Sequence, residues 1–341
     1  MKSLKDISWI VPEDTYRNDP ALSYSILSRF EKGGFAALKN LYEKESSDAL
    51  LFGSCVDAIL TNGGFNEKFI VADADEPQPA VKELIEHLYN IYGETIRDYD
   101  QFSNEQILTT AEMVFFYPRF GDEKKLERAN TGKDYYNFLC ISENKEIVTK
   151  EMYEKVQNCV QKLIDSPCGF LFTPTTNENV ETLYQLKFKA TFDDIEYRVM
   201  PDILQVDHVN KVIYPWDLKT TSSPEYDFYK SFIKWNYSIQ ARLYWRVIKE
   251  NLKNDDYFKD FRVEDYRFVV ANRDNPVPLS WIFDKTNAYG TINYCDGKIK
   301  MKDPFDLGKQ LMHYLTDCPP VPDGIDFAYD NDLSKWIEND R

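Results

Sequence analysis

The chain has 341 residues, of which 43% are hydrophobic and 15% aromatic, and this is ample for a sizeable core. No apolar run of about 18 residues occurs, so no transmembrane helix is expected, and the N-terminal stretch lacks the apolar segment of a secretory signal. Six cysteines without a CxxC pair argue against a zinc ribbon or a clustered iron–sulfur site and indicate reduced thiols in a cytosolic protein. A net charge of −16 argues against a protein that coats nucleic acid, but not against a local basic groove.

A metal site in this chain would have to be built from carboxylates. The three histidines, His87, His208 and His313, are far apart and at unrelated spacings. Carboxylate oxygens suit Mg²⁺ or Mn²⁺ better than zinc. Acidic surroundings are also expected at a cation site, because the cation offsets them.

The first half of the chain shows helical periodicity. Residues 22–48 carry apolar side chains at helical spacing around a Gly-Gly pair, which predicts two helices with a break. Residues 48–61 predict a helix with small side chains on one face. Residues 81–116 predict one or two amphipathic helices, and residues 147–167 predict a helix that a proline ends.

The second half has strand character. Residues 180–192 and 195–206 alternate or run apolar around Asp193-Asp194, which predicts a hairpin with an Asp-rich turn. The pattern then predicts a third strand, a helix, two more strands and a helical tail at 211–218, 224–252, 264–272, 279–283 and 303–316. Helices followed by this β-β-β-α-β-β order predict an α/β fold, with a mixed central sheet flanked by helices.

The sequence predicts a single domain. It contains no internal repeat, no low-complexity tract and no linker long enough to separate two domains. We therefore expect one domain over residues 1–341, with a helical N-terminal region at about 1–170 and a β-rich core at about 180–290.

Two carboxylates and a lysine fall at the ends of the second and third predicted strands. Asp202 follows Pro201, and Asp217 and Lys219 lie in the stretch YPWDLKTTSS. Residues two apart on a strand share a face, as Asp217 and Lys219 do. A short turn between antiparallel strands would bring Asp202 and Asp217 to about 5 Å at the backbone. Carboxylates this close repel unless a cation lies between them, so we expect both to bind a metal, with the backbone carbonyl of Leu218 as a further ligand.

Lys219 has a chemical and a structural interpretation. It could orient or deprotonate an attacking water, or stabilise the charge that develops on a phosphate. In the structural alternative, Asp202 caps a turn and Lys219 is solvated at a strand end. The pattern Pro-Asp followed by Asp-x-Lys is loose, and acidic chains match it often.

Three further stretches carry candidate residues. Gln240 and Tyr244 lie four apart on the predicted helix after the third strand, so they share a face that can turn toward the strand ends. Asp57 follows Gly53 in FGSCVDAIL and adds a third carboxylate, and Lys133 lies among aromatic residues in TGKDYYNFL. For Gln240 and Tyr244 the structural alternative is a half-buried helix face, and for Asp57 it is an ordinary surface acid. For Lys133 and its neighbours it is a solvated loop or the start of a helix.

Taken in order, these stretches resemble the PD-(D/E)xK nuclease superfamily. The resemblance is to its phage RecE-type exonuclease branch, related to lambda exonuclease and to RecB nuclease domains, and it implies a restriction-endonuclease-like core. It spans about residues 22–285, with the segments LSYSILSRF, FGSCVDAIL, TGKDYYNFL, EIVTKEMYEKVQNCVQKLIDSP, YRVMPDIL and PWDLKTTSSPEYDFYKSFIKWNYSIQARLYW. The pairing of DLKTT with YSIQARLY is its strongest part.

The resemblance implies a role for each matching residue. Asp202 and Asp217 match the two metal-binding acids, and Lys219 matches the catalytic lysine. Gln240 and Tyr244 match helix positions that support the site or touch DNA, so all five residues are candidate catalytic residues.

One position departs from the family pattern. Gly53 matches the motif glycine, but many relatives carry a histidine four residues later, where this chain has Asp57. A carboxylate can also bind a metal, so Asp57 joins Asp202, Asp217 and the carbonyl of Leu218 as an expected metal ligand.

The implied activity is that of a Mg²⁺-dependent deoxyribonuclease, with Mn²⁺ as the alternative metal. It would degrade linear double-stranded DNA from the 5′ end and leave 3′ single strands for recombination or repair. The implied partners are double-stranded DNA ends, a single-strand annealing protein and further copies of the chain, with no membrane, in a bacterial or phage-infected cytoplasm. An endonuclease of the same fold and a non-catalytic recombination protein that interacts with DNA are the alternatives. The basic residues expected to line a DNA cleft are Lys133, Lys219, Lys230, Lys234 and Arg242.

Overall fold

The chain folds into two compact units. In the computed structural model, the described residues are 1–43, 46–62, 64–72, 77–142, 145–274, 276–294, 297 and 299–316. The first unit takes its described residues from Met1–Ser46, Ile164–Asn272 and Val277–Arg341, and the second from Ser47–Leu163 and Arg273–Pro276. Residues 317–341 of the expected single domain lie outside the described part, and the one-domain organisation stays a prediction.

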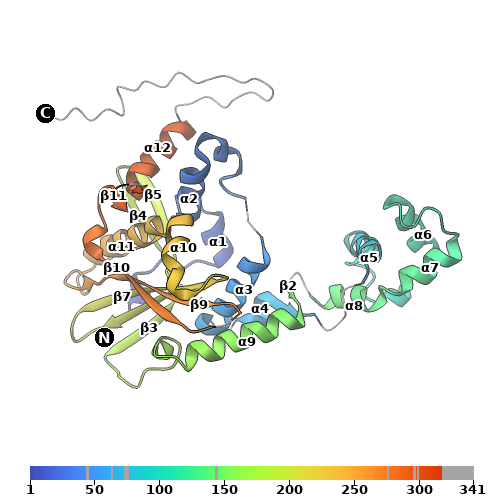
Figure 1. The fold of residues 1–341 in the computed structure, drawn as a ribbon, viewed down its shortest axis with the longest axis horizontal. Coiled ribbons are helices and arrows are strands. Elements are labelled where there is room, and N and C mark those ends of the chain that lie inside the picture. Colours follow the sequence, from blue (N-terminus) through green and yellow to red (C-terminus); the bar gives the residue numbers. More distant parts are fainter. Residues whose placement is uncertain are drawn as a thin grey trace. The chain divides into compact units, whose positions relative to one another are not determined.

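A mixed β-sheet forms the centre of the first unit (Figure 1). Its strand order is β10-β9-β7-β6-β3, with β8 paired to β7. Strands β8 and β9 run parallel to β7, and the other neighbours are antiparallel. The strands are β3 (Val180–Tyr184), β6 (Ile203–Asp207), β7 (Val212–Thr221), β8 (Arg262–Val263), β9 (Tyr266–Asn272) and β10 (Leu279–Phe283). The predicted fold class, α/β with a mixed central sheet flanked by helices, is confirmed.

The predicted hairpin around Asp193-Asp194 is present, but it is divided into two parts. Its outer half is a separate ribbon of β4 (Phe188–Phe192) and β5 (Ile195–Val199), whereas its inner half, β3 and β6, joins the central sheet. The two halves share one register, and the N–H of Gln185 still bonds to the carbonyl of Asp202 at 3.0 Å between them. Pro201 lies at this division, where it cannot donate a ladder hydrogen bond.

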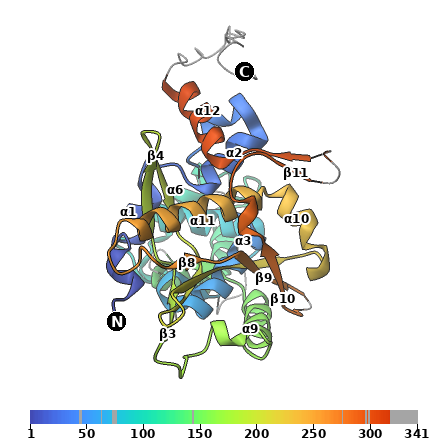
Figure 2. The ribbon, with the colours of Figure 1, turned by 90° about the vertical axis from the view of Figure 1, so that its left-hand side faces the viewer.

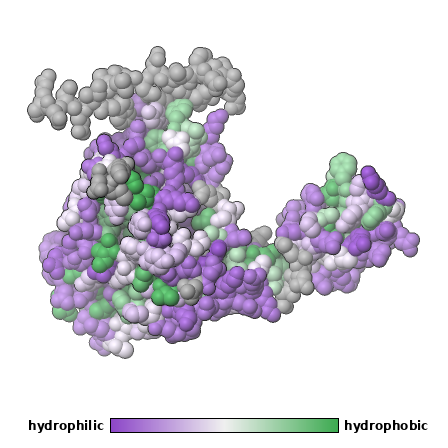
Figure 3. Space-filling model, viewed as in Figure 1, coloured by the Kyte–Doolittle hydropathy of each residue, from purple (hydrophilic) through white to green (hydrophobic). Residues whose placement is uncertain are grey.

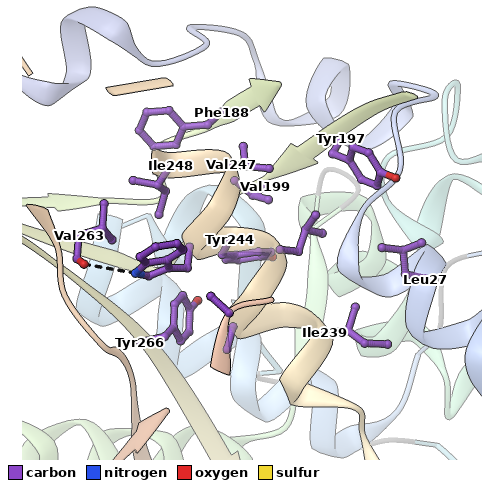
Figure 4. Close-up of a cluster of buried hydrophobic side chains, with 14 of the residues drawn as sticks. Leu27, Phe188, Tyr197, Val199, Ile239, Tyr244, Val247, Ile248, Val263 and Tyr266 are labelled. Carbon is purple, nitrogen blue, oxygen red and sulfur yellow. Dashed lines mark hydrogen bonds between the residues drawn. The ribbon is translucent and has the colours of Figure 1, made fainter. Parts of the chain in front are cut away.

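Helix α11 (Tyr237–Lys253) packs between the sheet and the β4–β5 ribbon (Figure 2). It connects β7 to the parallel strand β9, and such a crossover places its helix on one face of the sheet. Figure 4 shows the resulting core, in which Tyr244 of α11 lies near Tyr266 of β9, with Val199 of β5 in the same cluster. Most residues of α11 are buried, because the central sheet covers one side of the helix and the β4–β5 ribbon covers another.

The remaining elements of the first unit surround this core. Helix α2 packs against α11 and ends at Gly33. The next residue, Gly34, has a φ of +54° and breaks the helical pattern where the Gly-Gly pair predicts. These elements are η1 (Leu4–Ile7), α1 (Glu13–Asn18), α2 (Tyr24–Gly33), η2 (Gly34–Asn40), η5 (Gly169–Leu171), η6 (Glu225–Asp227), α10 (Phe228–Lys234), η7 (Lys285–Asn287), β11 (Ile292–Tyr294), β12 (Ile299–Met301) and α12 (Pro304–Thr316).

The second unit is mostly helical, as its sequence predicts. The predicted helix at 147–167 is α9, which ends shortly before Pro167. Strands β1 and β2 form a short parallel pair. The elements are α3 (Asp48–Asp57), η3 (Ala58–Asn62), α4 (Phe65–Lys68), β1 (Phe69–Val71), α5 (Pro79–Tyr92), η4 (Tyr99–Gln101), α6 (Asn104–Met113), α7 (Asp122–Asn130), α8 (Lys133–Ser142), β2 (Glu146–Val148) and α9 (Lys150–Ile164).

The molecular surface is largely hydrophilic in the view of Figure 3, with scattered apolar side chains. Within the described residues, no helix has both the length and the hydrophobicity needed to cross a membrane.

Candidate active site

The division of the hairpin places Asp202 beside the end of β7. Asp202 directly precedes β6, whose residue Ile203 pairs with Trp216 of β7. A carboxylate oxygen of Asp202 accepts a hydrogen bond of 2.7 Å from the N–H of Leu218. The carboxylate of Asp202 therefore accepts from β7 just beyond the last backbone pair between β6 and β7.

The backbone of Leu218 faces this same position. The N–H and the carbonyl of one strand residue point toward the same neighbouring strand. Because the N–H of Leu218 points toward Asp202, its carbonyl lies on that side as well. The role of the Leu218 carbonyl as a metal ligand stays a prediction.

Asp217 is fully buried, with Lys219 as its ion-pair partner. Its Oδ1 accepts a hydrogen bond of 2.6 Å from Nε2 of Gln240 on α11 and one of 3.4 Å from the hydroxyl of Tyr266 on β9. Its Oδ2 faces the ammonium group of Lys219. The structure thus brings together Asp217, Lys219 and Gln240, as the spacing predicts, and adds Tyr266, which the sequence analysis did not identify.

The electrostatics of the site keep Lys219 charged. Burial lowers the pKa of Lys219, but Asp217, Tyr237 and Asp202 outweigh it, and the pKa is raised well above its ordinary value. An ammonium group cannot accept a proton. Of the roles expected for Lys219, this arrangement excludes deprotonation of the water and leaves its orientation and the stabilisation of negative charge.

Asp202 and Asp217 influence the pKa values of the same neighbouring side chains. Both carboxylates influence the pKa of Lys219, and both contribute to the raised pKa values of Tyr237, Tyr244 and Tyr266, of which burial is the main cause. The two acids are thus close neighbours at one end of the sheet. This is the relationship that the hairpin prediction requires.

Two tyrosines complete the surroundings of Lys219. The ammonium lies 4.8 Å from the ring centroid of Tyr237, a favourable position for a cation over an aromatic face. The ring of Tyr24, on α2, lies 6.1 Å from that of Tyr237. Both residues fall within the segments LSYSILSRF and YSIQARLYW that carry the family resemblance, but single-sequence spacing gives no reason to select them.

Tyr244 is a core residue rather than a surface contact. It is only 8% exposed and packs edge-on against Tyr266, with ring centroids 6.1 Å apart. Tyr266 bonds to Asp217, so Tyr244 supports the site through its packing against Tyr266. Of the two roles expected for Tyr244, support and DNA contact, its burial favours support.

Asp57 belongs to the second unit, at the end of α3. Its carboxylate accepts a hydrogen bond of 3.3 Å from the hydroxyl of Thr61, whose shorter bond of 2.7 Å goes to the backbone carbonyl of Asp57. The assignment of Asp57 as a metal ligand stays a prediction.

The residues present fit a divalent cation at Asp202 and Asp217. Among the described residues, no group of three or more His, Cys, Asp or Glu side chains gathers around one point, so a metal here would be completed by neutral oxygens or water. One neutral oxygen is notable: Oε1 of Gln240 is buried and has no hydrogen-bond partner among the described residues, while Nε2 of the same side chain bonds to Asp217. A buried unpaired oxygen beside a carboxylate suits a cation.

The basic residues expected in a DNA cleft fall into different environments. Lys230 and Lys234 are exposed on α10, and Lys133 lies in the second unit, paired with Asp100. The expectation for Arg242 is wrong. Its side chain is fully buried, because it bonds to Asp303 at 3.3 Å and to backbone carbonyls that include that of Lys302 at 2.9 Å.

Comparisons with known proteins give no match by sequence and a distant likeness to a solved structure. No family model matches the chain, and no curated protein matches it. Among solved structures, the crystal structure of a candidate exonuclease from Eubacterium rectale is similar over 96% of this chain and 98% of that one, at 11% identity and a TM-score of 0.49. A likeness this distant does not carry an activity over to this chain, so the functional argument rests on the site itself.

Proposed function

We propose that this protein is a metal-dependent deoxyribonuclease that degrades linear double-stranded DNA from its ends. The observation that carries the proposal is the ion pair between the buried Asp217 and the half-buried Lys219 near the end of β7, with Asp202 beside it and Gln240 bonded to Asp217. A structural ion pair does not require a second carboxylate at the same place. Phosphodiester hydrolysis does require acids for a cation and a fixed positive charge for the phosphate.

The residues of the site divide the work of hydrolysis. Asp202, Asp217 and the carbonyl of Leu218 would hold Mg²⁺, or Mn²⁺ in its place, and Asp57 is a further candidate ligand. When bound, the cation would polarise the phosphoryl oxygen and offset its charge. Lys219 stabilises the negative charge that develops as water attacks phosphorus and the bond to the leaving sugar oxygen breaks.

The surrounding residues position these groups. Gln240 and Tyr266 fix Oδ1 of Asp217, and the ring of Tyr237 lies against the ammonium of Lys219. Tyr244 fills the core behind Tyr266. Side chains held by packing and hydrogen bonds on a helix and a sheet keep a site preorganised.

The finer assignments rest on the family resemblance. They are membership of the PD-(D/E)xK superfamily and its RecE-type branch, with a restriction-endonuclease-like core, and digestion of the 5′ strand to leave 3′ single strands for recombination. An annealing protein as partner, a homo-oligomer and a bacterial or phage-infected host cytoplasm belong to the same proposal. The order of the matching segments, from LSYSILSRF to the helix after DLKTT, supports these assignments.

End-labelled linear duplex and closed circular DNA, each incubated with Mg²⁺, separate the alternatives. Loss of label from linear ends without cleavage of the circle supports the exonuclease. Cleavage of the circle supports an endonuclease of the same fold, and no hydrolysis of either substrate supports a non-catalytic DNA-interaction protein. Duplexes labelled at 5′ or at 3′ ends then give the polarity.

Variants connect the activity to the site. Asp217→Ala should abolish hydrolysis, and Lys219→Ala should reduce it by about 10²- to 10³-fold, because one positioned charge at a developing oxyanion has that effect. Asp207→Asn is the matched control, since Asp207 ends β6 at the opposite end from Asp202 and an asparagine can also cap its turn. Undiminished hydrolysis by Asp217→Ala would exclude the site.

A further inference from the structure

Tyr237 is the first residue of α11, and its aromatic ring is held on several sides. The ring stacks on that of Phe228, with centroids 5.7 Å apart and planes 19° from parallel. The ring of Phe268, on β9, lies 5.9 Å away, and that of Tyr24, on α2, lies 6.1 Å away. Neighbours from three other elements therefore fix the position of this ring, and with it the position of the hydroxyl.

Two residues of α11 face two residues of β7. Gln240 donates to Asp217 at 2.6 Å. The ring centroid of Tyr237 lies 4.8 Å from the ammonium of Lys219. Three residues separate Tyr237 from Gln240, so the two are neighbours on one face of the helix, just as the acid and the lysine share one face of the strand. The helix thus carries the phenol of Tyr237 beside the charged groups of the candidate active site.

The hydroxyl of Tyr237 has no hydrogen-bond partner among the described residues, and its oxygen is not fully buried. Two neighbouring tyrosines differ in this respect. The hydroxyl of Tyr24 donates to the backbone carbonyl of Trp235 at 2.5 Å. The hydroxyl of Tyr266 donates to Oδ1 of Asp217 at 3.4 Å. Polar groups in a half-buried site usually have a partner, so the donor of Tyr237 is available to a ligand that enters the site.

The nearest carboxylate does not compete for this hydroxyl. Oδ1 of Asp217 accepts from Gln240 and Tyr266, and its Oδ2 faces the ammonium of Lys219. The acceptor for Tyr237 would therefore come from the substrate.

The phenol of Tyr237 keeps its proton at neutral pH. Tyrosine has an ordinary pKa of about 10, and burial raises the pKa of Tyr237 above it, against the opposing effect of Lys219. Asp217 and Asp202 raise this pKa as well, which agrees with a phenol close to both acids. A protonated phenol does not take a proton from water, but it donates a hydrogen bond.

A phosphodiester in the site would offer the acceptor. As water attacks phosphorus and the bond to the leaving sugar oxygen breaks, negative charge is spread over the non-bridging oxygens. Lys219 stabilises this charge in the proposed mechanism. Because the ring of Tyr237 lies against the ammonium of Lys219, a phosphate oxygen that meets the ammonium also comes close to the hydroxyl.

We propose that Tyr237 is a further catalytic residue, whose hydroxyl donates a hydrogen bond to a non-bridging oxygen of the phosphate that is cleaved. The bond strengthens as charge develops on that oxygen, so it stabilises the transition state more than the bound substrate. Tyr237 keeps its proton throughout, and the bonds that form and break are those of the hydrolysis itself. The inference rests on the proposed function, because it needs a phosphodiester as the substrate.

The test compares Tyr237→Phe with wild type in single-turnover hydrolysis of linear duplex DNA with Mg²⁺. Phenylalanine keeps the ring beside Lys219 and removes only the hydroxyl. We expect the rate to fall by about 10- to 100-fold, the range that one hydrogen bond to a charged oxygen supplies. The affinity for the duplex, measured in EDTA, should change much less. Tyr237→Leu removes the ring as well and should be slower still, because Lys219 then loses its aromatic contact.

Tyr257→Phe is the matched control. Its hydroxyl bonds to Nδ1 of His208 at 3.2 Å. His208 directly follows β6, at the opposite end of that strand from Asp202. Loss of this hydroxyl should change neither the hydrolysis rate nor the affinity for the duplex.

Other outcomes would overturn the proposal. A rate for Tyr237→Phe equal to that of wild type would show that the hydroxyl does not act, and a slow Tyr237→Leu would then reflect the ring alone. Equal losses of rate and of duplex affinity would show a contact that does not favour the transition state, and an equal loss with Tyr257→Phe would show an effect that is not local to the site. The proposed function fails differently: a wild type that hydrolyses no DNA would remove it together with the role of Tyr237, whereas hydrolysis that depends on Asp217 stands even if Tyr237→Phe is fully active.

Discussion

Gln240 of α11 donates a hydrogen bond of 2.6 Å from its Nε2 to Oδ1 of Asp217 on β7, and both side chains are buried. The bond joins the crossover helix to the strand that it follows in the chain. In the part of the chain that the structure describes, Oε1 of Gln240 is buried and has no hydrogen-bond partner. The predictions that follow begin from this pair of residues.

Gln240→Leu should reduce both stability and activity. The substitution removes a donor from a buried carboxylate, so we expect a loss of about 1–3 kcal/mol in the free energy of unfolding, measured with urea. The control is Asn251→Leu, later on the same helix, whose Nδ2 bonds to the carbonyls of Lys189 and Val247. Asn251→Leu should cost stability but leave the hydrolysis rate of the folded protein unchanged. Equal hydrolysis rates for the two variants would contradict the positioning role of Gln240.

Asp217 and Lys219 should be energetically coupled. Lys219→Met leaves a buried carboxylate without its cation, and Asp217→Asn leaves an ammonium without its anion, so each should cost about 3–5 kcal/mol. The double variant removes both charges and should lose less than the sum of the single losses. Urea unfolding of the four proteins measures the coupling, and strictly additive losses would show that the ion pair does not form.

Arg242→Met should destabilise the protein more than Arg246→Met. Both arginines contact Asp303, but the side chain of Arg242 is fully buried, whereas that of Arg246 is 17% exposed. Loss of Arg242 also removes its hydrogen bonds to the carbonyls of Met301 and Lys302. We expect about 3–5 kcal/mol for Arg242→Met. The DNA affinity of the folded variant should match that of wild type. A loss of DNA affinity without a loss of stability would show that Arg242 contacts DNA.

Asp194→Gly should stabilise the β4–β5 ribbon. Asp193 and Asp194 have φ values of +49° and +61°, the left-handed conformation that a tight hairpin turn requires. Glycine adopts this conformation without the cost that a Cβ imposes, so we expect a gain of about 0.5–1 kcal/mol. Asp193 stays in place to preserve its ion pair with Lys309. A higher thermal midpoint supports the prediction, and a lower one contradicts it.

Much of the site's framework can be predicted from local pattern. The Asp-rich turn predicts the hairpin, and the structure confirms its register over both halves. Asp217 and Lys219 share a face because strand periodicity requires it. Gln240 reaches Asp217 because the helix after β7 crosses back over the sheet.

The remaining parts of the site depend on contacts between distant segments. Tyr266 lies 49 residues after Asp217 and meets it only because β9 pairs in parallel with β7. Tyr24 comes from α2 near the N-terminus. The division of the hairpin at Pro201 is visible in the sequence only as a proline, and the sequence alone does not show that its two halves enter different sheets. Arg242 is a basic residue of the kind that contacts DNA, and only the tertiary fold shows that it is buried.

Titration of Mn²⁺ into the protein, followed by electron paramagnetic resonance, tests the central claim most directly. The claim is that Asp202 and Asp217 together hold the catalytic cation. Wild type and the control Asp207→Asn should bind Mn²⁺ at this site, whereas Asp202→Asn and Asp217→Asn should lose it while remaining folded. Equal Mn²⁺ binding by all four proteins would contradict the account.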